Sequence, residues 1–203
     1  MAKIKLTKNE QKKQKDSLKQ FTRYLPTLQL KKQQLQTVIR QSHAEIEELK
    51  VKQKEAVDGM KSWIAVYGEN SSWSEDRSIS HLVKVKEVKK TKGNIAGVEV
   101  PVFQSLVFED VPYDLRAYPL WVDKAIVALG EIARYDALIE TLKERIKLLE
   151  KELRTTTQRV NLFEKVKIPE AKDNIRKIGI YLQDQQTSAV VRGKIAKKKL
   201  GKV

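Results

Sequence analysis

The chain of 203 residues lacks cysteine, and aromatic residues make up only 6% of it. Without a thiol it forms no disulfide, no thiolate metal site and no cysteine nucleophile, which fits a reducing compartment. It also lacks any run of about 18 apolar residues, the length that spans a bilayer as a helix. Its first residues lack the apolar stretch of a secretory signal. We therefore expect a soluble cytoplasmic protein, although one that could lie beside a membrane.

Charged residues, in contrast, make up 33% of the chain, and hydrophobic residues make up 40%. The apolar share is too high for a disordered chain, whereas the shortage of bulky side chains argues against a large globular core. Long amphipathic helices reconcile these values, because each has a narrow apolar seam and a large exposed surface.

The net charge of +15 is concentrated at the two ends of the chain. Residues 1–32 hold ten Lys/Arg and two acids, and residues 192–203 hold six Lys/Arg and no acid. If the chain doubles back, the two basic ends lie together at one tip. Such a tip suits an acidic protein socket or nucleic acid, while frayed, solvated termini are an equally good interpretation.

The first third of the chain carries a heptad pattern that predicts a coiled-coil helix over residues 1–67. Thr7 and Glu10 have the spacing of a capping box at its start. Twelve of the fifteen seam positions are apolar over seven heptads, and a 3.5-residue period implies a left-handed supercoil. The seam consists of Leu18, Phe21, Leu25, Leu28, Lys32, Leu35, Ile39, Ser42, Ile46, Leu49, Gln53, Ala56, Met60, Trp63 and Tyr67.

The centre of the chain predicts a strand-rich head over residues 68–118, with the first helix ending near Gly68. Residues 81–88 and 98–103 alternate between apolar and polar, and residues 91–94 between them have turn composition. This arrangement predicts a β-hairpin. A lone hairpin is marginal in water, so it should pack against the helices.

The last third predicts a second coiled-coil helix with a basic tail over residues 119–203, beginning near Pro119. Its apolar seam slips by about one residue close to Pro169. The fold class expected from these patterns is mainly α, a long antiparallel two-helix coiled coil with a small central hairpin head. Pro26 and Pro169 are expected at nearly the same level of the helix pair, where both helices would bend. The seam runs through Ala125, Ile132, Tyr135, Ile139, Leu142, Ile146, Leu149, Leu153, Thr156, Val160 and Phe163, then Ile168, Ala171, Ile175, Ile178, Leu182 and Ala189.

Residues with recognisable catalytic spacing are lacking. The glycines form neither a Walker-type nor a dinucleotide-binding loop, and His43 and His81 have no metal-ligand spacing. A pair of helices also offers no pocket for a catalytic carboxylate pair. We expect a non-enzymatic protein with no catalytic residue, no cofactor and no metal.

Residues 5–10, 23–35, 94–103, 159–169 and 190–199 form a series of ordered motifs. These segments resemble the D subunit of the V-type/archaeal-type rotary ATPases, and the resemblance covers essentially the whole chain. Phe163 departs from that pattern, where a small residue with a tyrosine nearby is expected.

The resemblance implies a central rotor shaft that couples ATP hydrolysis or synthesis to rotation of the membrane ring and to proton or sodium transport. Both termini would enter the hexamer of catalytic A and regulatory B subunits, and the other end would meet the F subunit and the C (or d) subunit on the ring. Nucleotide and magnesium would belong to the hexamer. The chain would be peripheral to the membrane, without insertion into it and without bound nucleic acid.

Two sets of residues are the candidate contacts in this interpretation. The set expected to face the hexamer consists of Lys5, Lys8, Lys12, Lys13, Arg192, Lys194, Lys197, Lys198 and Lys199. The set expected to contact stalk partners consists of Trp63, Trp121, Ile95, Val98, Val100 and Phe103. The alternatives are a nucleic-acid-binding arm and a coiled-coil adaptor that bundles with its own copies.

Overall fold

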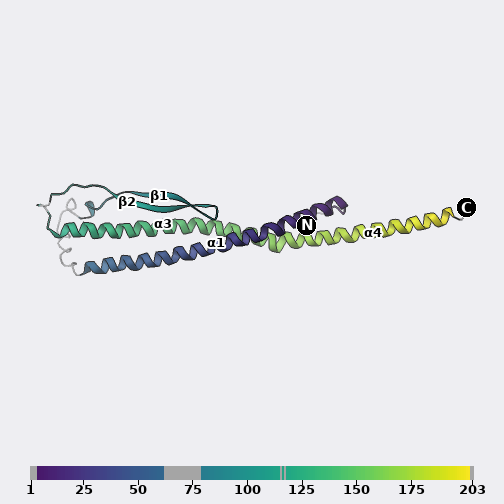
Figure 1. Cartoon of the computed structure of the whole chain (residues 1–203), viewed down its shortest axis with the longest axis horizontal. Coiled ribbons are helices and arrows are strands. Elements are labelled where there is room, and N and C mark those ends of the chain that lie inside the picture. The colour runs from purple at the N-terminus through teal and green to yellow at the C-terminus, as the bar shows by residue number, and fades with distance from the viewer. Residues whose placement is uncertain (1–3, 62–78, 115, 117, 202–203) are drawn as a thin grey trace. The chain divides into compact units, whose positions relative to one another are not determined.

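The computed structural model describes residues 4–61, 79–114, 116 and 118–201 (Figure 1). Helix α1 (Lys8–Met60) is followed by a short 3₁₀ turn (Ile79–His81) and the strands β1 (Val85–Ile95) and β2 (Val98–Phe108). Helix α3 (Trp121–Asn161), a π-helix (Leu162–Lys167) and α4 (Ile168–Leu200) complete the chain. The mainly helical fold with one small antiparallel sheet is confirmed. The predicted end of the first helix near Gly68 lies outside the described residues.

Contacts divide the chain into two compact units, each built from segments far apart in the sequence. The terminal unit comprises Met1–Gln33 and Arg154–Val203, and the central unit comprises Gln34–Leu153. The division cuts across both long helical segments. It differs from the predicted sequential boundaries at residues 67 and 118, which stay a prediction.

Helix α1 begins where the sequence predicts, one residue after Thr7. The Glu10 amide donates to Thr7 Oγ1 at 3.3 Å, which satisfies one of the free N–H groups of the first turn. The Glu10 carboxylate instead accepts from Gln14 Nε2 at 2.9 Å, one turn further along the helix. Thr7 therefore caps the helix, while Glu10 supports the next turn.

The central unit is held together by an apolar seam between α1 and α3. The heptad positions expected to face a partner are buried on both helices, and Val100 of β2 joins them. Gln53 Nε2 donates to Asp136 Oδ1 at 2.7 Å and links the two helices, which run antiparallel (Figure 1). The core cluster consists of Leu35, Ile39, Ile46, Val100, Ile139, Ile146 and Leu149.

The hairpin of β1 and β2 turns at Ala96–Gly97, not at residues 91–94, where the turn was predicted. Ile95 pairs with Val98, and the two residues between them have φ values of 51° and 78°. Both lie in the left-handed region, as a two-residue turn between twisted strands requires. Asn94 Oδ1 accepts from the Gly97 amide at 3.0 Å and fixes the turn. The predicted turn was wrong because residues 91–94, although polar, form a mostly exposed stretch of strand that leads into the turn.

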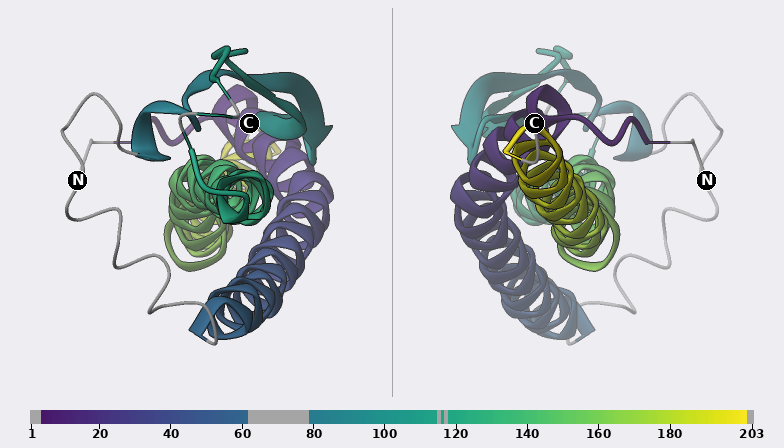
Figure 2. Two further views of the ribbon diagram at one scale, coloured as in Figure 1. Left: turned by 90° about the vertical axis from the view of Figure 1, so that its left-hand side faces the viewer. Right: turned by 90° about the vertical axis from the view of Figure 1, so that its right-hand side faces the viewer.

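The hairpin packs on the helix pair, as its marginal stability alone requires. It lies along α3, on a different side of that helix from residues 34–60 of α1 (Figures 1 and 2). Val100 is 2% exposed, and Ile95 and Val98 pack against the same core cluster. Lys90 Nζ also pairs with Glu144 of α3 at 2.6 Å. α3 therefore has two buried faces, one toward α1 and one toward the hairpin.

The terminal unit is a second antiparallel helix pair. Phe21 of α1 and Phe163 of the π-helix stack with ring centroids 5.2 Å apart. Gln11 reaches Gly179, where a Cβ atom would lie 3.4 Å from its Nε2. Val160 and Ile178 are buried in this unit, at 4% and 0% exposure. The same pairing direction therefore holds in both units.

The π-helix Leu162–Lys167 accounts for the predicted one-residue slip of the seam. Heptad spacing continued from Val160 would place the later seam positions one residue earlier than Ala171 and Ile178, which are buried apolar residues of α4; the polar Asn174, fourteen residues after Val160, is buried beside them. A π-helical turn accommodates one additional residue within an α-helix. It also precedes Pro169, which has no N–H to donate and would clash with the preceding turn of a regular helix. The slip is therefore absorbed locally.

The expected alignment of Pro26 and Pro169 at one level, with a shared bend, stays a prediction. From the stacked Phe21–Phe163 pair, the two prolines lie five and six residues away in opposite directions, which corresponds to roughly 16 Å at about 1.5 Å per residue. From the Gln11–Gly179 contact, they lie fifteen and ten residues away in the same direction, which corresponds to roughly 8 Å.

Ser42 is a seam residue whose replacement should stabilise the central unit. Its side chain is 0% exposed, and its hydroxyl has no hydrogen-bond partner among the described residues. We expect Ser42→Ala to raise the free energy of unfolding by about 1 kcal/mol, because the variant no longer buries an unpaired hydroxyl. Thermal and urea unfolding measure the change.

Thr141→Ala is the matched control for this variant. Thr141 is 2% exposed, and its hydroxyl donates to the Ala137 carbonyl at 2.7 Å. Loss of this hydrogen bond in Thr141→Ala should lower the free energy of unfolding by about 1 kcal/mol. Equal effects of the two substitutions would contradict this account of Ser42.

Candidate interaction surfaces

The terminal unit carries all nine basic residues predicted to face a hexamer. Every one of these side chains is exposed: Lys5, Lys8, Lys12, Lys13, Arg192, Lys194, Lys197, Lys198 and Lys199. None of the nine takes part in an ion pair that the structure shows among its described residues. Their charge is therefore available to a partner.

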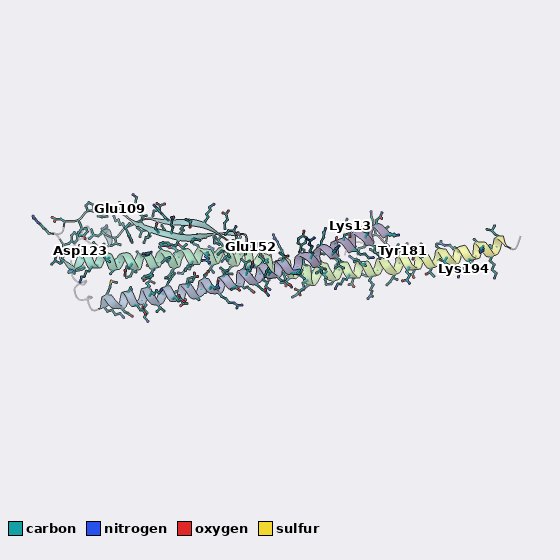
Figure 3. All side chains as sticks on the ribbon, viewed as in Figure 1. Lys13, Glu109, Asp123, Glu152, Tyr181 and Lys194 are labelled. Atoms are coloured by element: carbon teal, nitrogen blue, oxygen red, sulfur yellow. The ribbon has the colours of Figure 1, made fainter. Side chains whose placement is uncertain are left out.

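The sequence suggested that the two basic ends lie side by side at one tip. In the structure they are instead offset along the terminal unit. Because Gln11 reaches Gly179, the start of α1 is about level with residue 182, and α4 continues alone from there. Residues 183–200 are all exposed, and this end of α4 extends beyond the start of α1 in Figure 1. In Figure 3, Lys13 and Tyr181 lie near each other along the unit, and Lys194 lies well beyond both. The lone segment of α4 extends about 27 Å at 1.5 Å per residue.

The lone segment, residues 183–200, presents charge on several sides. At about 100° per residue, Arg192, Lys194 and Lys197 point in three different directions. Between these charges, Val190, Val191 and Ile195 are about half exposed, at 57%, 49% and 52%. A helix with this distribution suits an environment that surrounds it more than a flat surface on one side.

The residues predicted to contact stalk partners belong mostly to the packing of the central unit. Val100 is buried, and Ile95 and Val98 pack against its core. Trp121 is half-buried, and Trp63 lies outside the described residues. Contact of these residues with a partner stays a prediction.

Phe103, the remaining predicted stalk contact, is half-buried and lines a groove beside β2. The groove measures about 280 Å³, and its apolar lining includes Leu49, Leu138 and Leu142. Of the six stalk residues, Phe103 therefore combines partial burial with a described surface groove that a partner could enter.

A larger groove of about 420 Å³ lies at the open end of the hairpin, and its described lining includes none of the residues predicted to contact stalk partners. The strand ends, the loop after β2 and the first turns of α3 contribute to it. Only the fold brings these segments together, so residue spacing gave no signal of it. Its lining consists of Leu82, Val83, Phe108, Glu109, Asp110, Val111, Tyr113, Ile126, Val127, Gly130, Glu131 and Arg134.

The loop beside this groove is tied to the start of α3. Tyr113 Oη donates to Asp123 Oδ1 at 2.5 Å, and the Tyr113 and Tyr118 rings meet edge to face at 5.8 Å. The hydrogen bond to the Asp123 carboxylate raises the pKa of Tyr113 above its ordinary value. Asp123 also lies in the first turn of α3, where a negative charge is favourable.

Within the described ranges, no three His, Cys, Asp or Glu side chains form a group that could hold a metal ion. His43 and His81 are both exposed. A search of the same residues finds no helix with the length and apolar character needed to cross a membrane.

Comparison with known proteins gives consistent matches over nearly the whole chain. The family model for the ATP synthase D subunit matches residues 10–198. The V-type ATP synthase D subunit of Borreliella burgdorferi is 50% identical over 203 residues, which covers 98% of this chain and 96% of the relative. The D subunit of Chlamydia muridarum is 36% identical over 197 residues, covering 97% and 96%. That of Chlamydia pneumoniae is 34% identical over 204 residues, covering 97% and 93%.

Proposed function

Because the chain belongs to the D-subunit family of ATP synthases, and within it to the V-type enzymes, we propose that it is the central rotor shaft of that complex. In this role it couples ATP hydrolysis or synthesis in the A/B hexamer to rotation of the membrane ring and to proton or sodium transport. It is non-catalytic, peripheral to the membrane, and in contact with the hexamer, the F subunit and the C (or d) subunit. Nucleotide and magnesium belong to the hexamer.

The lone segment of α4 is the observation that carries the proposal. It is a helix of 18 residues without a helical partner among the described residues of its own unit, exposed throughout and basic on several sides. Such a segment exposes apolar side chains and unpaired charge, and both gain from enclosure by a partner. The hollow of a ring-shaped hexamer would enclose it from all sides.

The antiparallel pairing in each unit suits the transmission of torque. In the central unit the α1–α3 seam is continuous with the packing of the hairpin, and in the terminal unit Phe21 and Phe163 link the two helices. Two helices joined along a seam resist twisting and bending more than one helix does. A shaft whose faces differ contacts each surrounding subunit differently as it turns, and differential contact is what shifts a conformational equilibrium.

Neutralising the lone segment should weaken assembly with the hexamer. The variant replaces Arg192, Lys194, Lys197, Lys198 and Lys199 with Gln. At about 0.2–1 kcal/mol per exposed charge pair, five losses should weaken binding by roughly 5- to 5000-fold. Co-purification with the A and B subunits at increasing salt measures the effect, and the wild-type affinity should itself fall with salt.

A matched control replaces five exposed lysines of the central unit with Gln, at Lys84, Lys86, Lys89, Lys143 and Lys147. This control changes the net charge equally and should retain hexamer binding. Unchanged binding of the C-terminal variant would refute the hexamer contact. If the wild-type chain does not bind the A and B subunits but binds DNA with a steep salt dependence, the result would favour the nucleic-acid-binding arm instead.

A further inference from the structure

We infer that the groove at the open end of the hairpin docks a basic segment of another subunit, which inserts a bulky apolar side chain between β2 and α3. The identity of the partner as a stalk component of the same complex rests on the proposed function. The chemistry of the segment rests on the groove alone.

The floor of the groove is apolar and open to solvent. Phe108 and Val127 are 38% and 66% exposed, although both are large apolar side chains. Leu82, Val111 and Ile126 continue the same surface and are half-buried. Contiguous exposed apolar surface around a concavity is typical of a docking site. The volume of about 420 Å³ accommodates one or two large side chains.

The rim of the groove is acidic in a strongly basic protein. Among its described lining residues, Glu109, Asp110 and Glu131 are acidic and Arg134 alone is basic. The surrounding residues 109–136 hold six acidic and three basic residues, whereas the whole chain carries a net charge of +15. The complement to this rim is a segment with Lys or Arg on either side of its apolar residue. Nucleic acid is disfavoured here, because its phosphates would meet carboxylates.

The groove is preformed by backbone and side-chain contacts. The Glu109 amide donates to the Lys84 carbonyl at 2.8 Å and fixes the strand ends together. Gly130 leaves the α3 wall open, since a Cβ atom there would lie 3.6 Å from Phe108 Cζ. An alanine therefore fits at position 130 in ordinary contact, whereas a larger side chain would extend into the open space. A preformed site loses little conformational entropy on binding.

The test uses the full chain co-expressed with the A, B, F and C subunits. Gly130→Leu should fill the groove, and Glu131→Lys should reverse the charge of its rim. We expect each variant to weaken retention of the F or the C subunit by about tenfold or more, while assembly with A and B is unchanged. The matched controls are Gly130→Ala, which fits the wall, and Glu150→Lys, an exposed position of α3 outside the groove.

A photocrosslinking amino acid at Val127 identifies the occupant in the assembled complex. We expect it to join a segment of F or C in which an apolar residue is flanked by Lys or Arg. A crosslink only to a second copy of this chain, or to a segment without basic residues, would overturn the inference. The inference would also be overturned if Gly130→Leu and Glu131→Lys retained both the F and the C subunit as well as the wild-type chain does. Failure of the wild-type chain to join A and B would instead refute the proposed function.

Discussion

Deletion of Lys147 from α3 is expected to destabilise the central unit by about 3 kcal/mol or more. Removing one residue rotates everything after it by about 100° relative to what precedes it. Ile146 and Leu149, now 6% and 0% exposed, could then no longer face α1 together. Losing the burial of one such leucine typically costs about 2–5 kcal/mol. Circular dichroism during thermal unfolding measures the loss.

Deletion of Lys165 together with Pro169→Ala, in contrast, should not destabilise the protein. Lys165 is exposed and lies in the π-helix, where the seam has one residue more than heptad spacing requires. Its removal restores the spacing, and the alanine supplies the N–H that Pro169 lacks. We expect the free energy of unfolding to stay within about 1 kcal/mol of the wild type or to rise.

The comparison of these two deletions isolates the role of the π-helix. Each removes one exposed lysine, so loss of charge is matched, and Lys165→Ala reports the effect of the side chain alone. If the deletion at 165 with Pro169→Ala is as damaging as the deletion at 147, the π-helix does not absorb the seam slip. The buried register of Ala171 and Ile178 would then need another cause.

Val100→Asp is expected to release the hairpin from the helices while leaving the helices folded. Val100 is 2% exposed within the core cluster, and a carboxylate there would be desolvated without a charge partner. Detachment avoids that cost but loses about 2–3 kcal/mol of apolar burial. Hydrogen exchange of the Val85–Phe108 amides should then accelerate by roughly 100-fold, while the helical circular dichroism signal changes little.

Val102→Asp is the control on the same strand. Val102 lies two residues from Val100, but its side chain is 42% exposed, so a carboxylate there remains hydrated. We expect near wild-type exchange rates in the hairpin. Equal release of the hairpin by both substitutions would show that β-propensity, and not burial at Val100, holds it in place.

The heptad pattern predicted the seams of both units correctly where apolar side chains carry the signal. Leu35, Ile39 and Ile46 are buried as their spacing requires, and the polar seam residue Ser42 is buried with them. The prediction went wrong at Ala189, which is exposed because α1 does not extend far enough to cover it. A periodic pattern records which face of a helix is apolar, but not where its partner ends.

The second buried face of α3 had no usable signal in the sequence. Ala137 and Thr141 are 9% and 2% exposed. Alanine and threonine occur at surface positions as well as at buried ones, so neither residue type by itself indicates burial. They are buried because the hairpin packs along α3, a long-range contact that local periodicity does not encode. The groove with the acidic rim escaped prediction for the same reason.

The sequence by itself determined the helical segments, the hairpin, the one-residue slip near Pro169 and the family, because these depend on local spacing and on ordered motifs. The tertiary structure decided the turn at Ala96–Gly97, the offset of the two basic ends and the groove beside β2 and α3. These features depend on the register in which distant segments pair. Register is set by the packing of whole surfaces against each other, so no single stretch of residues contains it.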